Sequence, residues 1–163
     1  MAKRSHKVFL DSNVILSGLL SDKGSPRVIL DILSLALPVL SGATGRYNII
    51  EIERNLKKKM PGIIPLYRKY LPVMNLEIVP LPSLDTVKKL SKHIAAKDAP
   101  VLASAISCKT DYLITGDKKD FNKKGLKGKF GFKILGPSEF VKEVLPEVFR
   151  SIGEFHFKSK NIS

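Results

Sequence analysis

Acidic residues at or just beyond the ends of predicted strands are the groups in this sequence best placed to do chemistry. The segment KVFLD, residues 7–11, predicts a buried strand that ends at Asp11, and Asn13 follows it. The segment DYLIT, residues 111–115, predicts another strand and is followed by Asp117. In parallel α/β sheets, ligands bind beyond the carboxyl ends of the strands, where the strand order reverses. If these two strands are neighbours at that point, Asp11 and Asp117 share one crevice.

Three more acids are candidates for the same crevice. Glu51 lies in a predicted helix, Asp98 comes at the start of another, and Asp120 follows soon after Asp117. Several carboxylates in one crevice repel one another, which raises their pKa values and destabilises the fold. A divalent cation removes this cost, and hard oxygen ligands suit Mg²⁺ or Mn²⁺. Such a site indicates phosphodiester hydrolysis, because the cation neutralises the phosphate, activates a water and stabilises the leaving oxygen.

Each acid also has an ordinary structural use that the sequence leaves open. Asp11 is a good N-cap for a helix directly after it, and Asp98 suits the positive end of its own helix. Asp117 is compatible with a turn, Glu51 with a solvated helix face, and Asp120 with a cap or a turn. We favour the metal hypothesis because one crevice accounts for all of these acids, whereas the structural uses must each hold separately.

Strands and helices alternate along the chain, so we expect a three-layer α/β/α sandwich with a mostly parallel five-stranded sheet. The predicted strands cover residues 7–11, 37–42, 76–81, 111–115 and 132–135. The predicted helices cover residues 25–37, 44–60, 63–74, 83–94, 97–109 and 136–145. Ser25, Thr44 and Ser83 are the expected N-caps of three of these helices. Residues 1–145 are expected to form one domain, and residues 146–163 a C-terminal tail of unknown role, whose final residues, 151–163, are either a loose tail or an edge strand.

Net charge is the most informative feature of the composition. The 163 residues include 28 Lys and Arg but only 15 Asp and Glu, a net charge of +13. This surplus favours a polyanionic partner, most often nucleic acid, although lysine-rich proteins can also be basic without binding one. The single cysteine, Cys108, excludes an internal disulfide and a cysteine-based zinc site. No apolar run approaches the roughly 20 residues that span a bilayer, and the start is unlike a signal peptide, so we expect a cytoplasmic protein with no membrane contact.

Four segments carry a resemblance to a known family: VFLDSNVILSGLL, IIEIERNL, DAPVLASAI and DYLITGDKKDF. In this order and at these separations they resemble the PIN-domain ribonucleases, above all the prokaryotic single-domain members found as toxins of toxin–antitoxin pairs. The resemblance runs from about Lys7 to Val141. It implies a Mg²⁺- or Mn²⁺-dependent endoribonuclease in which an activated water attacks RNA and leaves a 5′-phosphate and a 3′-hydroxyl. It also implies RNA as substrate, an antitoxin as a partner, and a homodimer as a common assembly.

The resemblance assigns roles to individual residues. It gives the catalytic acids as Asp11, Glu51, Asp98 and Asp117, with Glu53 an alternative to Glu51. The metal ligands it implies are Asp11, Asp98, Asp117 and Asp120. The supporting polar residues it implies are Ser12, Asn13 and Thr115, with Ser12 or Thr115 orienting the attacking water and Asn13 beside the first acid.

Lysines that directly follow Asp117 are the expected contacts to RNA phosphates: Lys118, Lys119, Lys123 and Lys124. The main alternative to a nuclease is an RNA-binding PIN module of rRNA processing or ribosome assembly that has little or no catalysis. Metal titration distinguishes the two functions.

Overall fold

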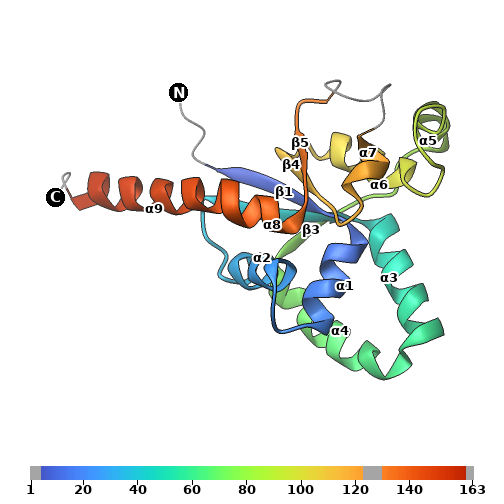
Figure 1. The fold of residues 1–163 in the computed structure, drawn as a ribbon, viewed down its shortest axis with the longest axis horizontal. Coiled ribbons are helices and arrows are strands. Elements are labelled where there is room, and N and C mark those ends of the chain that lie inside the picture. Colours follow the sequence, from blue (N-terminus) through green and yellow to red (C-terminus); the bar gives the residue numbers. More distant parts are fainter. Residues whose placement is uncertain (1–4, 123–129, 161–163) are drawn as a thin grey trace.

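The computed structural model describes the backbone of residues 5–122 and 130–160 and the side chains of these residues as far as residue 153. Five strands form one sheet in which every pairing is parallel, in the order β3-β2-β1-β4-β5 (Figure 1). The strands are β1 (His6–Leu10), β2 (Leu40–Gly45), β3 (Leu76–Val79), β4 (Tyr112–Ile114) and β5 (Lys133–Leu135). The predicted parallel five-stranded sheet is therefore confirmed.

Helices cover both faces of the sheet, which gives the predicted three layers (Figure 1). They are α1 (Ser12–Leu20), α2 (Ser25–Ser34), α3 (Arg46–Lys59), α4 (Ile64–Tyr70), α5 (Leu84–Leu90), α6 (Ala99–Ser107), α7 (Lys118–Phe121), α8 (Pro137–Glu139) and α9 (Leu145–Lys160). Short 3₁₀ turns at Pro61–Ile63 (η1) and Pro72–Met74 (η2) flank α4. Alternate residues of β1 serve the two layers: Val8 and Leu10 pack toward α1 and α2, and Phe9 packs toward α6.

The strand order reverses at β1, which has β2 on one side and β4 on the other. Phe9 pairs with Ala43 of β2, and Leu10 pairs with Ile114 of β4. Because β1 and β4 are parallel neighbours, the residues that follow them emerge at the same edge of the sheet. The expectation that Asp11 and Asp117 follow neighbouring strands is confirmed.

The junction between β2 and α3 differs from its prediction. β2 continues to Gly45, so Thr44 lies in the strand and does not cap α3; its hydroxyl donates to the backbone oxygen of Leu10 at 2.8 Å. The strand was predicted to end at residue 42 because Gly42 is typical of a turn. At Gly42 a Cβ would meet Leu76 at 2.7 Å and Leu33 at 2.8 Å, so the missing side chain is required for packing within the strand.

Two other helix starts test the predicted caps. Ser83 caps α5 as expected, because its hydroxyl accepts from the backbone N–H of Thr86 at 3.2 Å. Ser25 is already the first residue of α2, and the cap position belongs to Gly24, whose φ is 96°. The prediction for Ser25 is therefore wrong by one residue, because the turn before α2 needs a positive φ that glycine adopts at little cost.

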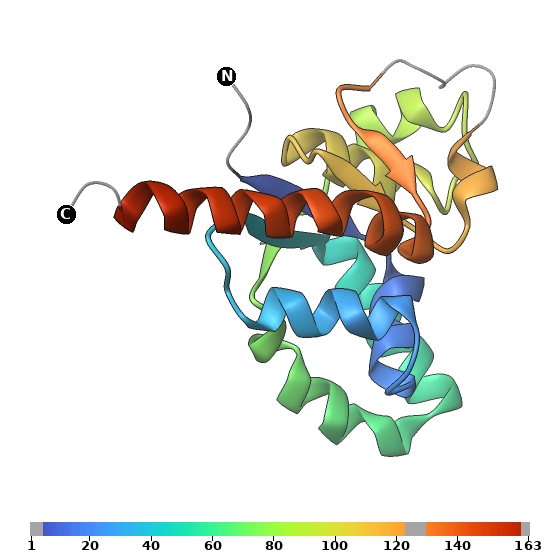
Figure 2. The same ribbon diagram turned by 60° about the vertical axis from the view of Figure 1, so that its left-hand side comes forward.

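The C-terminal segment is helical. A π-helical turn at Phe140–Val144 (η3) leads into α9, and Val148 of α9 is fully buried in the core. The expectation of a loose tail or an edge strand is therefore wrong for residues 151–160, which lie in α9, while the domain boundary after residue 145 stays a prediction. Figures 1 and 2 show α9 extending beyond the edge of the sheet. Among the described residues, no helix combines the length and apolar character that crossing a membrane requires.

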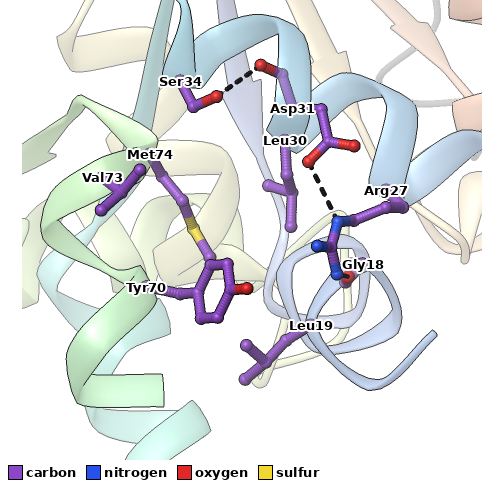
Figure 3. Close-up of a pocket in the computed structure, with 9 residues that line it drawn as sticks. All are labelled: Gly18, Leu19, Arg27, Leu30, Asp31, Ser34, Tyr70, Val73 and Met74. Atoms are coloured by element: carbon purple, nitrogen blue, oxygen red, sulfur yellow. Dashed lines mark hydrogen bonds and ion pairs between the residues drawn. The ribbon is translucent and has the colours of Figure 1, made fainter. Parts of the chain in front are cut away.

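Close packing joins α1, α2 and η2 below the sheet (Figure 3). Arg27 of α2 donates to Asp31 at 3.0 Å and to the backbone oxygen of Gly18 at 3.4 Å, and its guanidinium lies 5.5 Å from the ring centroid of Tyr70. A small cavity of about 40 Å³ remains between these groups. Gly18 lets α2 approach α1 closely, since a Cβ there would collide with the side chain of Leu30.

We expect Gly18→Ala to lower the free energy of unfolding by about 1–3 kcal/mol. Alanine normally stabilises a helix relative to glycine by roughly 0.5–1 kcal/mol, but this Cβ would lie 3.0 Å from Leu30 Cγ and from the backbone oxygen of Pro26. Gly62→Ala is the matched control, because a Cβ at Gly62 meets nothing within 4 Å. Urea denaturation measures both, and equal effects of the two substitutions would contradict the expected clash.

Candidate functional site

Asp11 lies at the centre of a hydrogen-bond network where β1 ends and α1 begins. Its side chain is only 7% exposed. Oδ1 accepts from the backbone N–H of Ser12 at 2.8 Å and from Asn48 at 3.2 Å, while Oδ2 accepts from the Thr115 hydroxyl at 2.8 Å. Asp11 therefore does cap α1, and the same carboxylate also joins three elements at the edge of the sheet.

The electrostatics of Asp11 show that the negative charges of neighbouring acids reach it. The pKa of Asp11 is raised from 3.8 to about 6, mainly by burial, with smaller contributions from the charges of Glu51 and Asp98, while the hydrogen bonds from Thr115 and Ser12 act to lower it. The charges of Glu51, Asp98 and Asp11 likewise add to the effect of burial in raising the pKa of Tyr47. These three acids thus share one electrostatic environment, in which a bound cation would be favourable.

Glu51 and Glu53 lie on different faces of α3. The Ser12 hydroxyl donates to Glu51 Oε2 at 3.1 Å, which brings Glu51 next to the Asp11 network. Glu53 is exposed, and its charge assists burial in raising the pKa of Tyr67 to about 12, toward α4. The geometry therefore places Glu51, and not the alternative Glu53, beside the first acid.

Asp98 is 9% exposed and occupies the N-cap position of α6. Its side chain makes no capping hydrogen bond to that helix, so Asp98 does not act as a hydrogen-bonding N-cap. Pro100 lies in the first turn of α6, where the N–H that proline lacks would have no partner within the helix. The helix α6 packs on the face of the sheet opposite to α1. The charge of Asp98 nevertheless contributes to the raised pKa of Asp11.

Asp117 closes the other side of the site. Asn13 donates to Asp117 Oδ2 at 3.0 Å and accepts from the backbone N–H of Gly116 at 3.0 Å. The backbone N–H of Asp117 donates to the Thr115 hydroxyl at 3.1 Å, and that hydroxyl donates to Asp11. Thr115 therefore connects the two acids that follow the neighbouring strands.

Asp120 is less closely tied to this network. Its backbone N–H donates to the backbone oxygen of Asp117 at 2.9 Å, within the short helix α7. Over residues 5–122 and 130–153, no side-chain hydrogen bond or ion pair is seen between Asp120 and the other candidate acids. Its assignment as a metal ligand stays a prediction.

The candidate acids do not form a closed ligand cage. Within the part of the chain that the structure describes, no three His, Cys, Asp or Glu side chains are close enough together to hold a metal ion. The donor set nevertheless fits a hydrated hard cation, since Mg²⁺ commonly keeps several waters and takes only one or two carboxylates from the protein. The buried Asp11, with its raised pKa, is the strongest indication of a cation here.

Asn48 is the site residue that sequence reasoning missed. It is fully buried on α3 and donates to Ser12 Oγ at 2.9 Å as well as to Asp11. Its Oδ1 accepts from the backbone N–H of Gly45 at 3.2 Å, so it also caps α3 from within. The signal was a polar residue four positions before Ile52, on the buried stripe of the helix.

The predicted RNA-binding lysines have different surroundings. Lys118 forms an ion pair with Glu139 at 3.0 Å, whereas Lys119 is exposed. Lys123 and Lys124 lie outside the described residues. Lys118 and Lys119 are close to Asp117 because they are the next two residues in the sequence, and their contact with RNA stays a prediction.

Comparison with known proteins supports the fold and the family. The chain is similar to the crystal structure of VapBC2 from Rickettsia felis bound to a DNA fragment from their promoter, at 17% identity and a TM-score of 0.59, over 80% of this chain and 98% of that one. No curated protein sequence was found to match. The family model described as PIN domain matches residues 7–119, a stretch that includes Asp11, Glu51, Asp98 and Asp117. PIN-domain proteins are nucleases that generally use divalent metal ions. The chain therefore belongs to the PIN-domain family.

Proposed function

We propose that this protein is a metal-dependent endoribonuclease that hydrolyses RNA phosphodiester bonds, acting as the toxin of a toxin–antitoxin pair. The observation that carries the proposal is the buried Asp11 carboxylate, connected to Glu51 through Ser12 and to Asp117 through Thr115. Such an arrangement is costly without a cation, because burial and like charges raise the pKa of Asp11. The site lies where ligands of parallel α/β sheets bind.

The side chains have distinct roles in this proposal. Asp11, Asp98 and Asp117 would hold a hydrated Mg²⁺ or Mn²⁺, directly or through its waters, and a bound ion would neutralise charge on the phosphodiester and acidify water. Thr115 fixes one oxygen of Asp11, and Asn13 fixes Asp117. Glu51, held by Ser12, faces the same crevice and accepts a proton from the attacking water.

The partners belong to the proposal as well. The resemblance of the sequence to toxin-like PIN proteins, together with the similarity in fold to VapBC2, supports an antitoxin as a protein partner. The net charge of +13 supports a nucleic-acid substrate, and we propose RNA. We place the protein in the cytoplasm, where such a substrate and partner are found, and a homodimer is the assembly that the family resemblance suggests.

Metal-dependent cleavage of a mixed pool of single-stranded and structured RNA tests the function. We expect cleavage by the wild-type protein with Mg²⁺ or Mn²⁺, none with EDTA, and a loss of at least about 100-fold in Asp98→Asn. Asp85→Asn is the control, since Asp85 is a highly exposed acid on α5. RNA binding without any cleavage in the wild-type protein would instead favour an RNA-binding PIN module.

Lys119 and Lys118 should differ in their effect on RNA affinity. Exposed Lys119 is free to approach phosphate, so Lys119→Ala is expected to reduce the slope of log affinity against log salt by about 1. Lys118→Ala should change that slope less, because its ammonium is paired with Glu139. Fluorescence anisotropy with a labelled RNA at several salt concentrations measures both, with Lys69→Ala on α4 as the control. An unchanged slope in Lys119→Ala would contradict the predicted phosphate contact.

A further inference from the structure

A cleft of about 240 Å³ opens directly beside Asp117. Asn13, Gly116 and Asp117 line its inner side, so this side belongs to the network of catalytic acids described above. We call this space the side cleft.

The remaining residues that line the side cleft, which we call its outer side, are Val14, Ser17, Pro26 and Pro137. Ser17 lies one helical turn after Asn13 on α1, so both side chains face the cleft. Pro26 and Pro137 lie in the first turns of α2 and α8, where their rings are held by the fixed φ of proline. The outer side is therefore apolar and rigid, with one hydroxyl group.

An ion pair holds the Pro137 side of the cleft against the Asp117 side. Lys118 contacts both carboxylate oxygens of Glu139, at 3.1 and 3.0 Å. Glu139 Oε1 also accepts from the backbone N–H of Gly136 at 3.1 Å, which fixes the residue before Pro137. The shape of the side cleft is thus built into the fold by groups on both sides of it.

The lining residues indicate which part of a substrate fits. Asp117 is negative, and none of the described residues that line the side cleft is cationic, so a phosphate group is disfavoured there. Amide and hydroxyl groups of Asn13 and Ser17 suit sugar hydroxyls and base edges, and proline rings suit the flat face of a base. The volume is below the roughly 300–1,000 Å³ of sites for drug-sized ligands, as expected for part of one nucleotide.

We propose that the side cleft binds the sugar and base of the nucleotide next to the scissile phosphate. This inference rests on the proposed ribonuclease function and adds a subsite to it. Contacts at this position select the nucleotide beside the cleavage point, so Ser17, Pro26 and Pro137 are specificity-determining residues. The phosphate itself stays at the acids.

Filling the cleft tests the proposal. Ser17 is exposed, so Ser17→Phe places a ring in the side cleft without disturbing the core. We expect the KM for RNA to rise roughly 5- to 100-fold, the range that one stacked base contributes. Hydrolysis of bis(p-nitrophenyl) phosphate, which has no sugar or base, should keep the wild-type rate. Ser107→Phe is the matched control, an exposed serine at the far end of α6.

Binding measured in the Asp98→Asn background separates this proposal from the proposed function. Weaker binding of an RNA oligonucleotide to Asp98→Asn/Ser17→Phe than to Asp98→Asn/Ser107→Phe supports the side cleft, even if the wild-type protein fails to cleave RNA. Equal binding by the two double variants, or an equal KM in Ser17→Phe and wild type, overturns the side cleft and leaves the nuclease proposal intact. A loss of bis(p-nitrophenyl) phosphate hydrolysis in Ser17→Phe would also overturn it, by showing damage to the acids themselves.

Discussion

Asp11→Asn is expected to lower RNA cleavage by at least about 1,000-fold while stabilising the metal-free protein at pH 8. The loss of activity follows because this carboxylate is the buried centre of the site and a metal ligand in the proposed function. The gain in stability follows because asparagine carries no charge to desolvate. A substitution that removes activity and raises stability would show that the Asp11 carboxylate is kept for its role in the reaction, at a cost in folding stability.

The pKa of Asp11 determines the sign and the size of the expected change in folding stability. The pKa of Asp11 is about 6 in the folded protein and 3.8 ordinarily, so between about pH 4 and pH 6 the folded state holds a proton that the unfolded state has lost. The stability of the metal-free protein therefore falls as the pH rises through this range, by up to roughly 3 kcal/mol from this group. Asparagine removes that dependence but loses part of the hydrogen bonding, so we expect a net gain of about 1–3 kcal/mol at pH 8.

Urea denaturation in EDTA, from pH 4.5 to 8, measures the effect. Asp22→Asn, an exposed acid after α1, is the control and should retain the pH dependence of the wild-type protein. Added Mn²⁺ should stabilise the wild-type protein, increasingly so above pH 6, and should stabilise Asp11→Asn much less. If Asp11→Asn were no more stable than the wild type at pH 8 without metal, the burial cost assigned to Asp11 would be wrong.

The architecture, and the position of Asp11 and Asp117 at one edge of the sheet, could be predicted from the sequence because local patterns encode them. β1 and β4 are short apolar segments with an acid just beyond each, and strand–helix alternation places such ends at one edge of a parallel sheet. The spacing of Ile49, Ile52 and Leu56 marked the buried face of α3. What these patterns could not supply was the side-chain partner of each acid.

The errors concern residues whose state depends on tertiary packing. Gly42 was predicted to end its strand and Gly45 to lie in the following helix, yet both lie in β2, where neighbouring side chains occupy the space that a Cβ would need. Thr44 has the chemistry of an N-cap, but its hydroxyl is used by the backbone of β1. The contacts of this strand with Leu10, Leu76 and Ser104 join residues that are far apart in the sequence, so propensity alone gave the wrong boundary.

Asn48 was missed for the same reason, and it is the second residue whose replacement should have a large effect. Because its Oδ1 accepts from Gly45, its two N–H groups point to Asp11 and Ser12. Ser12 then uses its own proton to donate to Glu51. One buried amide therefore orients two acids at once, Asp11 directly and Glu51 through Ser12.

We expect Asn48→Leu to lower kcat/KM or metal affinity by about 10- to 100-fold, the usual effect of removing a group that orients metal ligands. Leucine fills a similar volume, so the loss comes from the missing hydrogen bonds. The buried N–H of Gly45 is left without its acceptor, which should also cost about 1–3 kcal/mol of folding stability. Isothermal titration with Mn²⁺ and cleavage assays separate the loss in metal affinity from the loss in turnover.

Ser104→Ala is the control that distinguishes orientation of the acids from general loss of a buried polar group. Ser104 is fully buried and lies against Gly45, but its hydroxyl donates only to the backbone oxygen of Pro100 within α6. It should therefore lose some stability and keep both metal affinity and turnover. If Asn48→Leu and Ser104→Ala lowered activity equally, Asn48 would act through the fold alone. A selective loss in Asn48→Leu would instead show that a residue with no direct contact to metal or RNA sets the geometry of the acids.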